Sequence, residues 1–176
     1  MTHFRQGVLA AGALLLAVGP AGAQDKHAPA CSTDMMYQQQ DFTLGFWDVF
    51  GTDGRKSAEV RMEKRLDGCT IFETWTKPDG NKGNGLGLFT YSRQTKGWHY
   101  HWAADNGAMT VFTGSLVEPG EMRYMTERPT PGGGVRQRRW TLKLLPDGHV
   151  RELSVGSEDG GKSWTTEYDL LWVKKP

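Results

Sequence analysis

The sequence of 176 residues has only two cysteines, almost no surplus charge and no long apolar run after its first two dozen residues. It holds 21 Lys and Arg against 20 Asp and Glu. Nucleic-acid-binding domains usually carry a clear basic surplus, so this balance disfavours a nucleic-acid partner. A membrane-spanning helix needs about 20 apolar residues, and we expect none after residue 23. The composition is therefore that of an ordinary globular domain and does not select a fold class by itself.

The first 23 residues have the order of a secretory signal peptide. A short polar start with the single charge of Arg5 precedes the apolar run Gly7–Val18, and Ala21 and Ala23 supply the small residues of a cleavage site. A membrane anchor is the alternative, but this run is short for one. We therefore expect cleavage near Ala23, a periplasmic or secreted destination, and a mature chain of 153 residues with 20 charges of each sign.

Cys31 and Cys69 are the only cysteines of the chain. In an exported protein, two lone cysteines usually form a structural disulfide. A redox or metal-binding pair is the alternative, but it would need the close C-x-x-C spacing that is absent here. We therefore predict a disulfide that fastens the N-terminal arm to the folded domain.

Turn signals recur every 10 to 17 residues along the rest of the chain. Asp-Gly and Asn-Gly pairs favour tight hairpin turns, and the ten segments between the signals are rich in residues that suit strands. Within Ala58–Glu63 apolar and charged residues alternate, which indicates a strand with one buried face. The nine signals are at Asp53-Gly54, Asp67-Gly68, Asp79-Gly80, Lys96-Gly97, Asn106-Gly107, Pro119-Gly120, Gly132–Gly134, Asp147-Gly148 and Asp159–Gly161.

Ten sequential antiparallel strands must protect their outer edges, and closure into a barrel does this. We therefore predict an all-β fold with an antiparallel up-and-down barrel over residues 41–176, and a two-sheet sandwich as the alternative. Residues 24–40 form an arm with one candidate helix near Asp34–Gln40. In the last segment Trp164, Thr166, Tyr168, Leu170 and Trp172 are expected to share one face.

Gly45-Phe46-Trp47 opens the first strand and resembles the Gly-x-Trp motif of lipocalin-like (calycin) barrels. More widely, this opening, Glu73-Thr74-Trp75 and Ser157–Gly161 resemble a group of small exported bacterial lipocalin-like proteins. The resemblance implies that Trp47 closes one barrel end and that a basic residue packs on it, with Arg139, Arg151 and Lys174 as candidates. It implies no particular activity. Ten strands exceed the eight of lipocalins proper and suit a wider barrel.

Three local patterns are interpreted as structural. Ser157–Trp164 fits the Asp-box pattern S-x-D-x-G-x-[ST]-W, in which the carboxylate hydrogen-bonds its own turn. His99 and His101 share a face opposite three aromatic residues, so we expect them to point to solvent rather than bind metal. Gly83-x-Gly85-x-Gly87 lacks dinucleotide-loop spacing and is interpreted as a loop before a strand. We predict no cofactor and no metal site.

Glu73 shares a face with Ile71 and Trp75, and Arg138 shares one with Trp140. If these faces point inward, two polar groups enter an aromatic interior; the alternative leaves Glu73 in solvent. We predict a binding barrel for a small apolar or amphiphilic molecule. An enzyme with Glu73 as acid or base, and an envelope protein with a filled barrel, are the alternatives. The predicted ligand-binding residues are Glu73, Trp75, Tyr100, Trp102, Arg138, Trp140, Tyr168 and Trp172.

Overall fold

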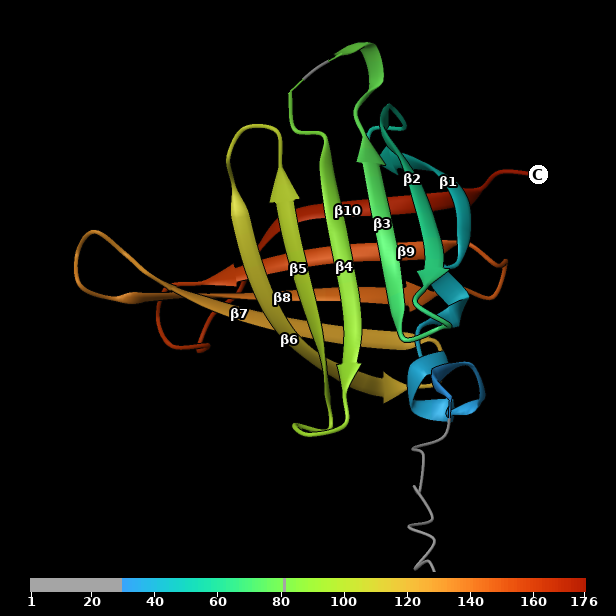
Figure 1. Ribbon diagram of the computed structural model, residues 1–176. Helices are drawn as coiled ribbons and strands as arrows, with labels where there is room; N and C mark the ends of the chain where they lie inside the picture. Colours follow the sequence, from blue (N-terminus) through green and yellow to red (C-terminus); the bar gives the residue numbers. More distant parts are fainter. Residues whose placement is uncertain (1–29, 81) are drawn as a thin grey trace, which may run out of the picture.

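The structure, a computed structural model, describes residues 30–80 and 82–176 (Figure 1). The predicted signal peptide, residues 1–23, and the first part of the arm lie outside the described residues. No helix in the described part of the chain is long and apolar enough to cross a membrane. Cleavage near Ala23 and export therefore stay predictions.

Ten antiparallel strands follow one another around a closed barrel, in which the first strand also pairs with the last. This confirms the predicted up-and-down barrel and rules out the open sandwich. Strands β3–β6 cross in front of β7–β10 at a steep angle, so the barrel is flattened (Figure 1). The strands are β1 (Gly45–Gly51), β2 (Lys56–Arg65), β3 (Thr70–Thr76), β4 (Gly85–Ser92), β5 (Gly97–Ala104), β6 (Met109–Glu118), β7 (Glu121–Pro129), β8 (Val135–Leu144), β9 (Val150–Ser157) and β10 (Thr165–Lys174).

All nine predicted turns lie at connections between consecutive strands. Glycine is needed at several of them because the backbone has a positive φ, as at Gly54 (75°) and Gly148 (84°). The β3–β4 connection is longer and contains a single 3-10 turn, η4 (Pro78–Gly80). The spacing of the turn signals thus predicted the number and the order of the strands correctly.

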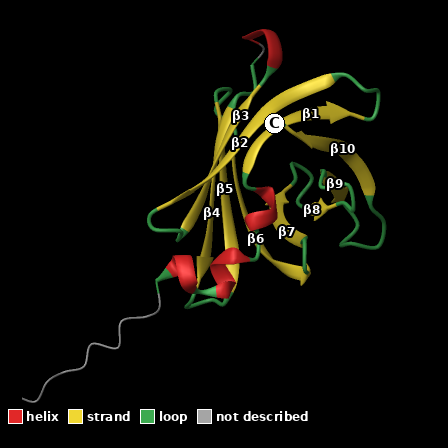
Figure 2. Cartoon of the chain, turned by 90° about the vertical axis from the view of Figure 1, so that its right-hand side faces the viewer, coloured by secondary structure: helices red, strands yellow, loops and turns green. Residues whose placement is uncertain are grey.

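The N-terminal arm folds into three short 3-10 helices at one end of the barrel, opposite the β3–β4 connection (Figure 2). The predicted helical segment is therefore present, as 3-10 turns. The side chain of Asp34 caps the second one by accepting a hydrogen bond from the Met36 N–H at 3.0 Å. The predicted disulfide between Cys31 and Cys69 is formed, and it ties the arm to the β2–β3 connection. The three helices are η1 (Cys31–Thr33), η2 (Met35–Gln38) and η3 (Asp41–Thr43).

The arm seals this end of the barrel through buried contacts. The ring of Tyr37 packs edge-on against Tyr91, with 5.4 Å between centroids. The indole of Trp98 donates a hydrogen bond to Gln39 Oε1 at 2.9 Å. Gln40 is fully buried and accepts a hydrogen bond from the hydroxyl of Tyr124 on β7. These contacts hold the arm against this end of the barrel.

Trp47 lies at the same closed end and is 1% exposed. Its indole N–H donates to the Thr43 carbonyl at 2.8 Å, and its ring lies 6.1 Å from that of Trp172. Of the three basic candidates, Lys174 packs on this ring, with Nζ 5.4 Å from the centroid. Arg139 instead covers Trp164. This arrangement, together with the closed barrel, is consistent with a lipocalin-like fold.

The Asp-box segment forms the turn between β9 and β10, as expected. Asp159 Oδ1 accepts hydrogen bonds from the backbone N–H groups of Lys162 and Ser163, and Oδ2 accepts one from the Ser163 hydroxyl. These bonds lower the pKa of Asp159, the hydroxyl of Ser163 contributing most. The segment is therefore a rigid hairpin turn on the outside of the barrel.

The prediction that five residues of the last segment share one face is right for Tyr168, Leu170 and Trp172 and wrong for Trp164 and Thr166. The register of β10 against β9 shifts between Thr166 and Tyr168, which marks a β-bulge. An extra residue in one strand reverses the faces that lie beyond it. Trp164 consequently lies outside the barrel under Arg139, whereas Tyr168 and Trp172 point inward.

Candidate functional site

A cavity of about 350 Å³ occupies the half of the barrel interior that faces away from the arm. Its size is in the range of pockets that hold one small ligand. Its walls come from seven strands and from the residue that follows β3. The lining residues are Ser57, Glu73, Trp75, Lys77, Tyr100, Trp102, Thr110, Phe112, Arg138, Trp140, Glu152, Tyr168 and Leu170.

The cavity opens at the rim opposite Trp47 and the arm. Ser57 and Thr110 are each the second residue of a strand, and Lys77 directly follows β3. These positions border the connections β1–β2, β5–β6 and β3–β4. The side chains of Trp75 and Trp102 are partly exposed, which shows that solvent reaches the upper walls.

Seven of the eight predicted ligand-binding residues line this cavity. The exception is Trp172, which is fully buried beneath it and contacts Trp75 at 6.5 Å between ring centroids. The structure thus brings the predicted residues together, although no ligand is present to show what they bind. The inward orientation of Glu73 resolves the question that the mixed alternation of its strand had left open.

Aromatic rings form most of the cavity surface. Tyr100 stacks on Trp140 at 4.8 Å between centroids, and Phe112 packs against Tyr100 at 5.6 Å. Nearer the mouth, Trp75 and Trp102 meet edge to face at 6.5 Å. Stacked and edge-on rings hold each other in place, so they present fixed flat surfaces to a ligand.

Glu73 carries one of two carboxyl groups at the cavity and is 2% exposed. The Tyr100 hydroxyl donates a hydrogen bond to its Oε2 at 2.7 Å. Its Oε1 has no hydrogen-bond partner among residues 30–80 and 82–176. Burial raises the pKa of Glu73 to about 8, because desolvation outweighs the hydrogen bond from Tyr100. Glu73 is therefore mainly protonated at neutral pH.

Two glycines of β4 make room for the side chains of the cavity wall. A Cβ at Gly87 would lie 2.3 Å from Glu73 Oε2 and 2.7 Å from Cε2 of Tyr100. A Cβ at Gly85 would lie 2.2 Å from the indole of Trp102. Both residues belong to strand β4, so interpreting them as part of a loop was wrong. They are glycines because large side chains of neighbouring strands cover their backbone.

Glu152 is the second carboxyl group, and the sequence reasoning missed it. It is 4% exposed, and the indole N–H groups of Trp140 and Trp172 donate to its two oxygens, each at 2.8 Å. Burial raises the pKa of Glu152, although the hydrogen bonds from Trp172 and Trp140 lower it. The apolar Leu153 and Val155 lie on the opposite face of β9. Because they are apolar, the sequence pattern suggests that their face, and not that of Glu152, points inward. The i, i+2 relation with the buried Val150 was the signal available.

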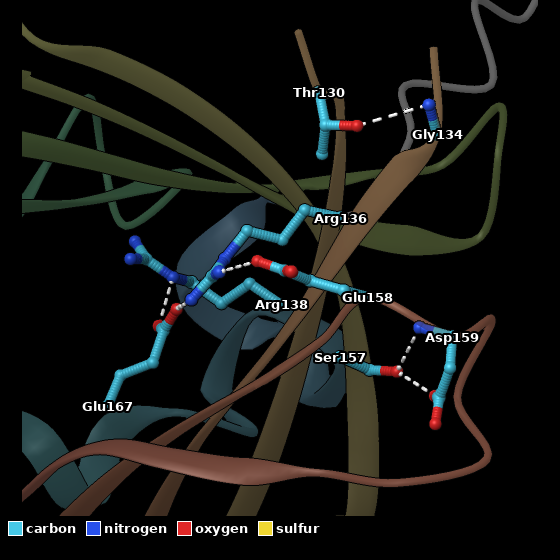
Figure 3. A network of polar contacts seen from close by, with 8 residues as sticks. All are labelled: Thr130, Gly134, Arg136, Arg138, Ser157, Glu158, Asp159 and Glu167. Atoms are coloured by element: carbon cyan, nitrogen blue, oxygen red, sulfur yellow. Dashed lines mark hydrogen bonds and ion pairs between the residues drawn. The ribbon is translucent and has the colours of Figure 1, made fainter. Parts of the chain in front are cut away.

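Arg138 reaches the cavity, but its charge is already paired. Its Nε lies 2.5 Å from Glu167 Oε2, and Arg136 donates to Glu167 Oε1 at 2.6 Å (Figure 3). The Ser154 hydroxyl donates a further bond to Glu167. Burial alone would raise the pKa of Glu167, yet these bonds from Arg136, Ser154 and Arg138 lower it. Arg138 therefore enters the cavity as one member of an ion pair with Glu167.

The bulge in β10 explains why Glu167 was not found from the sequence. Simple alternation would turn Glu167 to the outside because its neighbour Tyr168 faces inward. Glu167 is itself the extra residue of the bulge, between Thr166 and Tyr168. It therefore turns toward Arg136 and Arg138 instead. Gly156 opposite supplies the space, since a Cβ there would lie 2.8 Å from Glu167 Oε1.

Gly156–Ser163 also matches the spacing G-x-x-x-x-G-K-[ST] of phosphate-binding loops, which the sequence reasoning did not recognise. Such loops bind phosphate through free backbone N–H groups at the start of a helix. Here the stretch joins two antiparallel strands, and Asp159 occupies the N–H groups of Lys162 and Ser163. The geometry does not form a phosphate site.

His99 and His101 lie on the outer face of β5, as predicted, with Trp98 and Tyr100 buried on the inner face. No group of three His, Cys, Asp or Glu side chains within the described ranges is placed to hold a metal ion. A search of known protein families and a search of curated proteins found no match to this chain. Function must therefore be argued from the cavity itself.

Proposed function

We propose that this chain binds a small, partly apolar molecule inside the barrel. The observation that carries the proposal is the cavity of about 350 Å³, which is lined by seven aromatic or aliphatic side chains and opens at one rim. Pockets of this kind, apolar with a few convergent polar groups, are typical of small-molecule binding sites. A filled interior would have favoured the envelope-protein alternative. Export to the periplasm or medium remains part of the proposal.

Tryptophan emission offers a direct test, because three indoles line the cavity. Apolar fluorescent probes should bind the native protein and quench this emission. Thr110→Trp should block binding, since Thr110 points into the cavity near the mouth. Thr113→Trp is the matched control, because Thr113 is exposed on the outer face of the same strand. Failure of a broad panel of probes to bind wild-type protein would contradict the proposal.

An enzyme that uses Glu73 as acid or base is the second candidate. The observation in its favour is a carboxyl group with a pKa of about 8 and a free oxygen at a cavity. Glu73→Gln separates the two functions once a ligand is known. An enzyme would lose turnover and keep binding, whereas a pure binding protein would show no turnover in either form.

A further inference from the structure

The charges at the cavity do not balance. Glu73 and Glu152 are both buried at its inner wall, and neither forms an ion pair with a Lys, Arg or His of the described chain. The pair Arg138–Glu167 contributes no net charge. Lys77 stands at the mouth, directly after β3. The deep part of the cavity therefore offers acceptors and no positive partner.

The hydrogen bonds that Glu152 accepts favour its carboxylate form, although burial raises its pKa. Both of its oxygens accept an indole N–H, from Trp140 and from Trp172. A protonated carboxyl would have a hydroxyl on one oxygen, which is a poor acceptor, so the two bonds are best made by the carboxylate. Burying a carboxylate among neutral donors is costly unless a cation joins it. A missing cation is the simplest completion of this site.

The surrounding rings are suited to the same partner. Tyr100 and Trp140 line the deep part of the cavity, and Trp75 and Trp102 line the path from the mouth. Aromatic faces attract organic cations through their negative π surfaces, most strongly where water is excluded. An ordinary metal ion is not favoured by this surface, whereas an ammonium group on an apolar body is.

We propose that the ligand is an organic cation, an amine with an aromatic or aliphatic body, whose ammonium group lies between the carboxyl groups of Glu73 and Glu152. The body fills the space beside Trp75 and Trp102 toward the mouth. This inference rests on the proposed function and specifies its ligand class. The free Oε1 of Glu73 then gains the donor that the protein does not supply.

Binding of such a ligand releases a proton. Glu73 is mainly protonated in the free protein, and an ammonium ion beside it favours the carboxylate. The amine enters as R–NH₃⁺, the O–H bond of the Glu73 carboxyl group breaks as its proton passes to water or buffer, and no other covalent bond changes. The other groups that face Glu73 are Tyr100 on β5, Tyr124 on β7 and Glu152 on β9. Burial raises the pKa of both tyrosines and of Glu152. The tyrosines therefore stay neutral at pH 7, and an ammonium ion favours the carboxylate form of Glu152 as it does that of Glu73.

Matched indoles test the ligand class on the wild-type protein. Tryptamine, tryptophol and indole-3-propionate share a ring and differ in carrying an ammonium, a hydroxyl or a carboxylate. Calorimetry at pH 7.5 should give tryptamine an affinity at least about 10-fold higher than that of either analogue. The same order should hold for phenethylamine against its alcohol and acid. Equal or tighter binding of the alcohols or acids would overturn the inference while leaving the binding barrel intact.

Two further measurements test the position of the ammonium group. Titration in phosphate and in Tris should reveal release of about one proton per tryptamine at pH 7, because the two buffers differ in ionisation enthalpy. Tryptamine binding without proton release would place the amine away from Glu73 and overturn the site. Glu152→Gln should reduce the preference for tryptamine to less than about 3-fold, whereas Glu118→Gln on the surface should leave it unchanged. If neither amines, alcohols, acids nor apolar probes bind, the proposed function fails as well.

Discussion

At the scale of single residues, the interior departs from the usual separation of apolar and charged groups at Glu73 and Glu152. Buried carboxyl groups without a positive partner lower stability, because ionisation in a low-dielectric interior is unfavourable. Glu73 avoids this cost by holding its proton, and Glu152 offsets it with two indole N–H bonds. Groups kept at such expense are typical of functional sites rather than of structural cores.

Glu73 should make the stability of the protein depend on pH. Its ordinary pKa of 4.5 applies to the unfolded chain, and the folded value is about 8. Between these values unfolding releases a proton, so the contribution of Glu73 is complete below pH 4.5 and is lost as the pH rises through about 8. In urea unfolding, the free energy of unfolding of Glu73→Gln relative to that of the wild type should therefore increase between pH 5 and pH 9, by on the order of 4 kcal/mol.

The control for this experiment is Glu118→Gln, which changes an exposed carboxyl group of β6. It should follow the wild type at every pH within about 0.5 kcal/mol. A constant difference between Glu73→Gln and the wild type from pH 5 to 9 would mean that Glu73 is not buried in its protonated form.

Trp47 should contribute strongly to stability because it fills the closed end of the barrel. We expect Trp47→Ala to lower the free energy of unfolding by about 3–5 kcal/mol, as other large aromatic truncations in cores do. Trp164→Ala removes a partly exposed indole from the outer surface, so it should cost only about 1 kcal/mol. Denaturant unfolding of both variants measures this, and a loss below about 1 kcal/mol for Trp47→Ala would place Trp47 outside the core.

At the scale of elements, strand β4 has the most restricted inner face. Gly87→Ala should displace the carboxyl group of Glu73 or the ring of Tyr100, since the new Cβ would lie 2.3 Å from Glu73 Oε2. Overpacking of this kind costs roughly 1–3 kcal/mol. The matched control is Gly97→Ala on β5, where the nearest atom would be at 3.5 Å. In thermal unfolding, Gly87→Ala should have a lower melting temperature than Gly97→Ala. Equal melting temperatures would show that the side chains next to Gly87 move aside without cost to stability.

The arm depends on its covalent link for a fixed position. Cys31 and Cys69 are separated by 38 positions in the sequence, and closing this loop stabilises the folded chain by about 4 kcal/mol in the chain-entropy description. The double variant Cys31→Ser with Cys69→Ser should lose about this amount in urea unfolding. Reduced wild-type protein is the control and should lose as much. Peptide mapping that finds two free thiols in freshly purified protein would contradict the link.

The strands and their inner faces could be predicted where apolar and polar residues alternate regularly. They could not be predicted where the backbone is irregular. Asp-Gly and Asn-Gly pairs placed the turns, and Trp98, Tyr100 and Trp102 showed the inner face of β5. The bulge before Tyr168 carries no residue signature of its own, so Trp164 was assigned to the wrong face. The inward Glu152 was hidden because its strand carries apolar residues on both faces.

At the scale of the whole molecule, length and turn count predicted a closed barrel, because sequential antiparallel strands have few other ways to protect their edges. The cavity could not be predicted in the same way. Its volume depends on which side chains meet inside the barrel, and on how Trp102, Glu73 and Tyr100 occupy the space that Gly85 and Gly87 leave. The ion pair between Arg138 on β8 and Glu167 on β10, which meet over β9, likewise joins residues whose separation in the sequence carries no signal.

An even number of antiparallel strands returns the chain to the rim from which it started. Trp47 near the start of β1 pairs with Lys174 at the end of β10, so the described chain enters and leaves at the rim closed by the arm. Neither end of the described chain lies at the rim where the five connections surround the mouth. A dye, a surface tether or a fused domain attached after Pro176 would therefore leave the opening facing solution. Immobilised in this way, the barrel could serve as an oriented sensor element for its ligand.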